Sequence, residues 1–226
     1  MLFMAVFDEV ARDYDDWYLT KMGNLVDEVE TGLAFELFSP ERGMTVLDVG
    51  CGTGNFSLKL ARKGCLVTGV DISRQMLGAA AEKAAAEGLD IDFQPMDVYE
   101  LKFPDESFDA VFSMAAFEFI KDPERAMDQI FRVTKKSGRV MIGTINRDSS
   151  WGELYSSEEC RNNNVFKYAC FKTPGEMASL KKKNLVAVRQ CLFIPPGAAG
   201  DEISPERERQ LSASGRGGFI CALWRK

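Results

Sequence analysis

Short apolar runs alternate with longer segments of helical periodicity through the middle of the chain. Five of these runs have the length of buried strands, and they lie at about 44–49, 65–70, 90–95, 108–114 and 139–145. Three helical patterns lie between them, at about 54–63, 73–87 and 123–135. Because parallel strands need crossover helices between them, this alternation predicts an α/β fold with a doubly wound, mostly parallel sheet.

The segments on either side of this core extend the prediction. Residues 7–38 have a helical pattern, whereas residues 146–172 form a polar insertion with recurring aromatics. Apolar runs at 185–194 and 218–226 predict an antiparallel hairpin at the edge of the sheet, which brings the sheet to seven strands. We expect a single domain, 1–226, with four parts: a helical N-terminal segment (1–40), the core (44–146), the insertion with its helix (147–183) and the hairpin strands (184–226).

A glycine-rich turn follows the first predicted strand directly. Gly50, Gly52 and Gly54 come immediately after the strand and before a helical pattern. A strand, a glycine turn and a helix in this order let the backbone approach a ligand, because a Cβ there would collide with it. The spacing differs from the Gly-x-Gly-x-x-Gly of nicotinamide sites. Asp48, just before the turn, would repel a pyrophosphate but suits a ligand with a cationic amine.

Carboxylates follow the next two predicted strands. Asp71 ends the second strand, and Asp97 comes soon after the third. The carboxyl ends of parallel strands meet at one edge of a sheet, so we expect both acids near the glycine turn. A carboxylate can accept hydrogen bonds from two neighbouring hydroxyls. Two plainer readings stay open: Asp71 caps the helix that begins at Ser73, and the turn holds no ligand.

These motifs together resemble class I S-adenosylmethionine-dependent methyltransferases. The resemblance is carried by Asp48-Val-Gly-Cys-Gly-Thr-Gly54, by the two acids at family-typical distances, and by residues 101–112, which lead into strand four. Phe7, Asp8, Ala11, Tyr14, Asp15 and Trp17 match an opening common in the type 11 branch, which includes quinone-biosynthesis enzymes. The resemblance implies a Rossmann-like fold, an N-terminal cap over the cofactor and a lid formed by the insertion after strand five.

The resemblance also implies a set of cofactor contacts. Asp71 would take the ribose hydroxyls, and Asp97 and Val98 would hold adenine. Ser113 and Met114 would line the methionine portion. The full set of positions expected to contact S-adenosylmethionine, or its product S-adenosylhomocysteine, is Tyr14, Asp48, Gly50, Cys51, Gly52, Thr53, Gly54, Asp71, Ile72, Met76, Asp97, Val98, Ser113 and Met114.

The acceptor site is expected beneath the cap and the insertion. Tyr18, Phe117, Asn146, Trp151 and Tyr155 are the positions predicted to contact the acceptor, although the aromatics among them also fit an ordinary core. Glu118 is the candidate catalytic group, as a base or as a partner for a cationic acceptor, with a plain helix-surface acid as the alternative. Because the chain has no histidine, histidine-assisted methylation of a hydroxyl is disfavoured. Thiols, acidic carbons and amines stay open as acceptors.

Composition narrows the class of protein. A chain of 226 residues with 46% hydrophobic and 27% charged residues can form one sizeable α/β domain. The net charge of −6 disfavours a general nucleic-acid surface, so we expect a small-molecule acceptor. Six cysteines without a Cys-x-x-Cys pair, and without histidine, predict no metal site and a reducing cytoplasm. No signal peptide or membrane span is expected, and a homodimer is one assembly that the family branch allows.

Three alternatives to a methyltransferase stay open. A nicotinamide-dependent oxidoreductase could use the same sheet, but the glycine spacing and Asp48 disfavour it. A non-catalytic S-adenosylmethionine-binding regulator or assembly subunit would keep the cofactor motifs and need no base. A third protein type would use the same cofactor to transfer another group.

Overall fold

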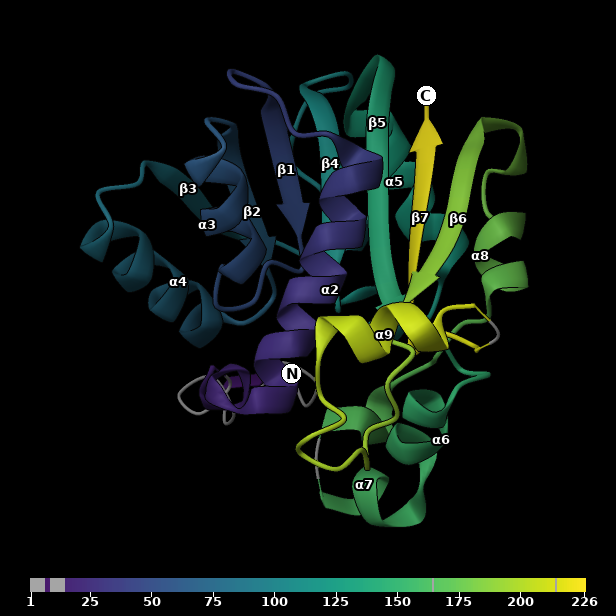
Figure 1. The fold of residues 1–226 in the computed structure, drawn as a ribbon. Coiled ribbons are helices and arrows are strands. Elements are labelled where there is room, and N and C mark those ends of the chain that lie inside the picture. Colours follow the sequence, from purple (N-terminus) through teal and green to yellow (C-terminus); the bar gives the residue numbers. More distant parts are fainter. Residues whose placement is uncertain (1–6, 9–14, 164, 214) are drawn as a thin grey trace.

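The computed structural model describes residues 7–8, 15–163, 165–213 and 215–226. Within these residues seven strands form one sheet, with helices packed on both faces (Figure 1). The strands are β1 Thr45–Val49, β2 Leu66–Asp71, β3 Ile91–Pro95, β4 Phe108–Met114, β5 Thr134–Ile145, β6 Leu185–Cys191 and β7 Phe219–Arg225.

The strand order across the sheet is β3-β2-β1-β4-β5-β7-β6. The pairs from β3 to β5 are all parallel, whereas β7 runs antiparallel to both β5 and β6. The predicted fold class, a mostly parallel seven-stranded sheet with an antiparallel pair at one edge, is therefore confirmed. The last two strands form the expected antiparallel pair at the edge, with β7 next to β5 and β6 outermost.

Helices connect and cover these strands. Side chains cap several of them: Ser73 accepts a hydrogen bond from the Met76 amide, and Thr173 with Glu176 forms a reciprocal capping box. No helix among the described residues has the length and apolar character needed to cross a bilayer. The α-helices are α2 Lys21–Phe38, α3 Asn55–Arg62, α4 Arg74–Ala86, α5 Pro123–Val133, α6 Ser150–Ser156, α7 Glu158–Asn163, α8 Pro174–Ser179 and α9 Pro205–Leu211. The 3-10 helices are η1 Asp16–Leu19, η2 Val98–Glu100, η3 Phe117–Phe119, η4 Val165–Tyr168 and η5 Lys182–Asn184.

Two apolar clusters cover the two faces of the sheet. On one face Phe38 of α2 packs against Phe112 of β4, with ring centroids 5.1 Å apart. On the other face Met127 and Ile130 of α5 are fully buried with Val111 of β4. Neighbouring residues of β4 thus point to opposite faces, as the pleat of a strand requires. This two-sided burial explains why the strands appear in the sequence as continuous apolar runs.

Some element boundaries differ from the sequence prediction. The β5 strand starts at Thr134 rather than near 139, because a register shift lets Thr134 pair with Phe108 beyond an irregularity. The helix expected to reach 183 ends at Ser179, since Lys181 adopts a left-handed conformation with φ of 45°. The N-terminal helical pattern is interrupted at Thr20, whose side chain caps the start of α2.

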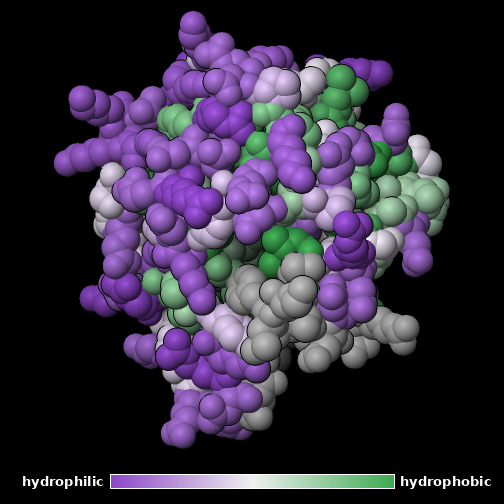
Figure 2. Space-filling view, turned by 180° about the vertical axis from the view of Figure 1, so that it is seen from behind, coloured by the Kyte–Doolittle hydropathy of each residue, from purple (hydrophilic) through white to green (hydrophobic). Residues whose placement is uncertain are grey.

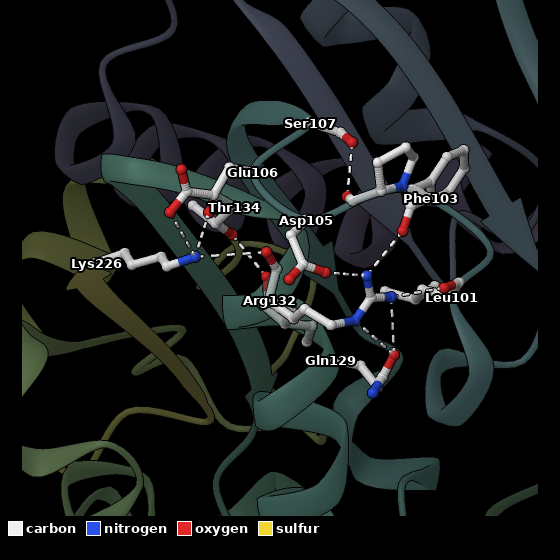
Figure 3. Close-up of polar contacts among 11 residues, drawn as sticks. Leu101, Phe103, Asp105, Glu106, Ser107, Gln129, Arg132, Thr134 and Lys226 are labelled. Carbon is white, nitrogen blue, oxygen red and sulfur yellow. Dashed lines mark hydrogen bonds and ion pairs between the residues drawn. The ribbon is translucent and has the colours of Figure 1, made fainter.

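Arg132, near the end of α5, fastens the segment that leads into β4 (Figure 3). Its guanidinium donates to the carbonyl oxygens of Phe103 at 2.8 Å and Leu101 at 2.7 Å. It also forms an ion pair with Asp105 at 2.8 Å. In the same view Lys226 donates to the carbonyl of Thr134 at 2.7 Å. The planar fork of one arginine thus satisfies two backbone acceptors of an otherwise irregular segment.

We expect Arg132→Ala to lower the free energy of unfolding by about 2 kcal/mol, because two carbonyl groups lose a charged donor. Urea unfolding followed by circular dichroism measures this change. Lys102→Ala, at an exposed position of the same segment, is the control and should alter stability little. Equal unfolding midpoints for the two variants would show that water replaces the guanidinium without cost.

Candidate active site

A cavity of about 540 Å³ opens at the carboxyl ends of β1, β2 and β4. Its wall includes Val49, Val70 and Met114, which lie at or next to the ends of these three strands. In Figure 1 the same ends of the strands face the part of the molecule that contains α6 and α7. Its volume lies in the range of small-molecule sites, about 300–1,000 Å³.

The glycine turn forms one wall of this cavity. Gly50 has a φ of 69°, and a Cβ there would lie 2.5 Å from the Cβ of Ala116. Gly54 has a φ of 81°, and a Cβ there would lie 2.9 Å from the Cβ of Ala80 on α4. The amides of Gly50 and Cys51 both donate to the carbonyl of Val70, at 2.8 and 3.1 Å. Only glycine fits these positions without strain, so the turn stays close to β2 and α4.

Asp71, the last residue of β2, lines the cavity with both carboxylate oxygens held in place. One oxygen accepts from the amide of Gly52 at 2.9 Å, and the other accepts from the amide of Ser73 at 2.9 Å. Burial raises the pKa of Asp71, while these backbone hydrogen bonds oppose the shift. Asp71 therefore joins the glycine turn to the segment before α4 and also lines the cavity, whereas the cap of α4 is Ser73 rather than Asp71.

Asp48 lies behind the cavity wall rather than in it. Its carboxyl group is 1% exposed and accepts a 2.6 Å hydrogen bond from the hydroxyl of Ser57 on α3. Burial raises the pKa of Asp48 to about 7, although the bond from Ser57 opposes this and the nearby Asp71 adds to it. In this structure Asp48 connects β1 to α3 beneath the glycine turn.

Most of the predicted cofactor positions converge on the cavity. Ten of them line it: Gly50, Cys51, Gly52, Thr53, Asp71, Ile72, Met76, Asp97, Val98 and Met114. Gly54 and Ser113 lie behind the wall together with Asp48, and Tyr14 lies outside the described residues. The Ser113 hydroxyl is buried, with no hydrogen-bond partner among the described residues. The contacts assigned to these residues stay predictions.

Asp15, just before η1, is joined to the glycine turn and the following helices by polar contacts. One oxygen of Asp15 accepts from Thr53 and from Asn55, both at 2.9 Å. The other oxygen pairs with Lys83 of α4 at 2.6 Å. Next to this anchor, Tyr18 of η1 lines the cavity. Asp15 and η1 thus lie beside the cavity, and the cap over the cofactor stays a prediction.

The predicted acceptor positions divide into two groups. Tyr18, Trp151 and Tyr155 line the cavity, whereas Phe117 and Asn146 do not. Phe117 is fully buried in the apolar cluster that also contains Met127 and Ile130 of α5. The Asn146 amide group donates to the carbonyl of Gly217 at 2.8 Å. Tertiary packing sets the side-chain directions in these short segments. Their place in the sequence alone therefore did not show that Phe117 and Asn146 point away from the cavity.

Aromatic rings enclose the part of the cavity next to α6. Tyr155 stacks on Phe166 with centroids 4.1 Å apart, and Phe166 stacks on Phe119 at 6.1 Å. The indole N–H of Trp151 donates to the carbonyl of Ile194 at 2.8 Å. Aromatic residues of the insertion therefore line part of the cavity, and Trp151 also packs inward, whereas the lid stays a prediction.

Apolar side chains also reach the surface beside the cavity. The face seen in Figure 2 is largely hydrophilic, with apolar side chains gathered near the middle and along the right-hand side. Trp17 and Leu19 of η1, and Leu154 of α6, are 39%, 84% and 42% exposed. The same two elements, η1 and α6, also supply residues that line the cavity.

Glu118, in η3, is a buried acid rather than the helix-surface acid that was its alternative. It is 1% exposed, lines the cavity and accepts a 3.0 Å hydrogen bond from the Thr144 hydroxyl. Burial raises the pKa of Glu118 to about 7, against the opposing effect of Thr144. A carboxyl group that titrates near neutrality inside a cavity is typical of functional sites.

Sequence reasoning missed Glu30 of α2, which lines the same cavity and is 7% exposed. A signal was present, because Glu30 lies four residues after Val26 and three before Leu33, within the apolar stripe of the helix. Charged residues rarely occupy such positions. Further lining residues outside the prediction include Phe56, Met96, Tyr99, Phe119, Phe166 and Leu192.

Comparisons with known proteins agree with this geometry. Residues 47–142 match the type 11 family described as a methyltransferase domain. A solved Thermotoga maritima structure, described as a SAM-dependent methyltransferase and possible histamine N-methyltransferase, is 25% identical with a TM-score of 0.77 and covers 99% of both chains.

Curated relatives match over shorter stretches. "Putative methyltransferase YqeM" of Bacillus subtilis is 40% identical over 86 residues, which is 37% of this chain and 29% of the relative. The 23S rRNA (uracil(1939)-C(5))-methyltransferase RlmD of Acidithiobacillus ferrooxidans is 37% identical over 75 residues, 33% of this chain and 17% of the relative. The chain thus spans less than a third of the length of either relative.

The sheet order, the glycine turn and the cavity at the strand ends define a class I S-adenosylmethionine-dependent methyltransferase fold. Within this fold, residues 47–142 are the stretch that is similar to the type 11 methyltransferase domain.

Proposed function

We propose that this protein transfers a methyl group from S-adenosylmethionine to a small-molecule acceptor by in-line displacement. The observation that carries this proposal is the continuity of one cavity. The same space is bordered by the glycine turn and Asp71 and by Glu118 and the aromatic insertion.

The residues on the strand-end side of the cavity fit S-adenosylmethionine. The Asp71 carboxylate lies where two ribose hydroxyls could donate to it, and Asp97 with Val98 follows β3 on the expected adenine side. The glycine turn presents backbone without side chains. When bound, S-adenosylmethionine supplies a methyl group already activated by a sulfonium. The remaining tasks of the chain are therefore to align the acceptor and to exclude water.

A small molecule fits the acceptor side better than a nucleic acid. Tyr18, Tyr155, Glu30 and Glu118 line the cavity, and we assign them to the acceptor side. The formal net charge of the chain is −6, which disfavours binding to a phosphate backbone. The match to the rRNA methyltransferase covers only 75 residues, so it concerns the shared domain more than an acceptor site.

Two measurements test this function. We expect S-adenosylhomocysteine, and not NADH, to raise the melting temperature, because only a ligand that binds the folded state stabilises it. We then expect transfer of labelled methyl groups from S-adenosylmethionine to at least one compound in a panel of small amines, thiols and carbon acids. Binding without transfer to any acceptor would favour the regulator or assembly subunit. Absence of binding at millimolar ligand would contradict the assignment, and transfer to RNA alone would contradict the acceptor class.

A further inference from the structure

Two carboxyl groups from distant segments face the same enclosed space. Glu30 lies on α2 and Glu118 on η3, and both line the cavity. They are 7% and 1% exposed, so neither is solvated as a surface acid would be. The charge of Glu118 is close enough to affect the ionisation of Glu30. The fold therefore brings two acids together at a place where burial of either is costly.

Neither carboxyl group has a cationic partner among the described residues. The carboxyl group of Glu118 accepts hydrogen bonds from the Thr144 hydroxyl and from its own backbone amide, and no described residue donates a hydrogen bond to Glu30. Lys59 lies near Glu30, but its ammonium binds Asp27 and the hydroxyl of Thr31.

Lys172 is the cation that acts on Glu118. Its ammonium group donates to the carbonyl of Cys170, and no described ion pair joins it to Glu118. Two buried carboxyl groups thus share a cavity that is lined by no lysine or arginine among the residues that the structure describes.

Aromatic rings line the same cavity as the two carboxyl groups. The stacked rings of Tyr155 and Phe166 lie 4.1 Å apart, and Phe119 and Trp151 also line the space. Burial and, to a smaller extent, the charge of Glu118 raise the pKa of Glu30 well above its usual range. A bound cation would supply the missing partner, and the aromatic faces would add a favourable cation–π contribution.

We propose that Glu30 and Glu118 form the recognition site for a cationic amine with an aromatic or other apolar body, and that this amine is the methyl acceptor. This inference rests on the proposed function. Glu30 holds the ammonium group, and Glu118 removes one of its protons. The nitrogen lone pair then forms the bond to the methyl carbon while the carbon–sulfur bond breaks, and its electron pair goes to sulfur. The products are a methylated ammonium ion and S-adenosylhomocysteine.

A second source of cation must be separated from the acceptor. S-adenosylmethionine carries its own α-ammonium group, which could also pair with Glu30. We therefore design the test around the complex with S-adenosylhomocysteine, which retains that group. If the carboxylates recognise the acceptor, an amine binds in addition to S-adenosylhomocysteine. If Glu30 pairs instead with the α-ammonium group of S-adenosylhomocysteine, that carboxylate is already occupied when the amine is added.

Calorimetry at saturating S-adenosylhomocysteine compares matched probes. Benzylamine, phenethylamine and tyramine are each paired with the neutral alcohol of the same skeleton, and phenylacetate serves as the anionic probe. We expect at least one amine to bind tenfold or more tightly than its alcohol, with phenylacetate weakest. Titration in two buffers of different ionisation enthalpy should show proton release with the amine and none with the alcohol, because the cation favours the ionised carboxylates.

Substitution of Glu30 by glutamine separates recognition from structure. Glu30→Gln should lose at least tenfold in amine affinity and keep its affinity for S-adenosylhomocysteine. It should melt at the same or a higher temperature, since it removes a buried carboxyl group without a donor. Glu28→Gln, at an exposed position of the same helix, is the matched control and should leave all three measurements unchanged.

Each contrary result has a distinct meaning. If every amine binds no better than its alcohol, the recognition site is wrong. If Glu30→Gln weakens S-adenosylhomocysteine as much as it weakens the amine, the carboxylates serve the cofactor and the acceptor proposal is overturned. If the unsubstituted protein does not bind S-adenosylhomocysteine at all, the proposed function fails before the amine site is reached.

Discussion

Replacing Asp71 by alanine is expected to weaken S-adenosylhomocysteine binding at least tenfold. Its two carboxylate oxygens lie in the cavity wall, each fixed by a backbone amide at 2.9 Å. A fixed carboxylate can accept both ribose hydroxyls without reorganising. Hydrogen bonds to a charged group contribute about 1.5–3 kcal/mol each, and 1.4 kcal/mol corresponds to a tenfold change in affinity. Isothermal titration calorimetry measures the effect directly.

Two further variants make this prediction specific. Asp71→Asn keeps one acceptor oxygen and should fall between the alanine variant and the unsubstituted protein. Asp92→Ala, on the exposed side of the neighbouring strand β3, should bind as the unsubstituted protein does. Melting temperatures without ligand check that each variant is folded. Unchanged affinity in folded Asp71→Ala would mean that the ribose lies elsewhere.

Replacing Glu118 by glutamine is expected to change how stability depends on pH. Burial raises the pKa of Glu118 from 4.5 to about 7 in the folded protein. Between these two pH values the folded state retains a proton that the unfolded state has released. The protonated carboxyl therefore contributes fully to the free energy of unfolding below pH 4.5, and this contribution is lost as the pH rises through 7. The loss amounts to about 3 kcal/mol, which Glu118→Gln avoids because an amide does not ionise.

Chemical unfolding at a series of pH values measures this effect without ligand. The stability of Glu118→Gln relative to the unsubstituted protein should increase from pH 5 to pH 8. Glutamine keeps an oxygen that can accept from Thr144, so the comparison isolates ionisation. Glu82→Gln, at an exposed position of α4, is the control and should follow the unsubstituted profile. Parallel profiles for Glu118→Gln and the unsubstituted protein would show that Glu118 ionises freely in the folded state.

The core of the fold was predictable because strands that are buried on both faces appear in the sequence as continuous apolar runs. The strand β4 was predicted at its observed bounds, 108–114, since its residues must face apolar clusters on both sides. The start of β5 was not, because the pairing of Thr134 with Phe108 depends on a register shift that no local pattern shows. Local periodicity thus identified the elements but not every boundary.

Site residues were predictable where the ends of the strands position them. They were less predictable where the direction of a side chain decides whether it reaches the cavity. The glycine turn and Asp71 reach the cavity because strand ends position them. Phe117 and Glu118 are neighbours in η3, yet Phe117 enters the core and Glu118 the cavity. Glu30 was not predicted because a helical pattern shows only that the apolar stripe of α2 is buried. It does not show that this stripe borders a cavity.

The position of β7 between β5 and β6 has a consequence for how the molecule is assembled. During translation β6 leaves the ribosome before the strand that must separate it from β5. Until β7 inserts, β5 and β6 each have an edge with unpaired backbone hydrogen-bonding groups. Direct pairing of β5 with β6 would then be a competing misfold. We expect nascent chains arrested before Phe219 to depend on chaperones.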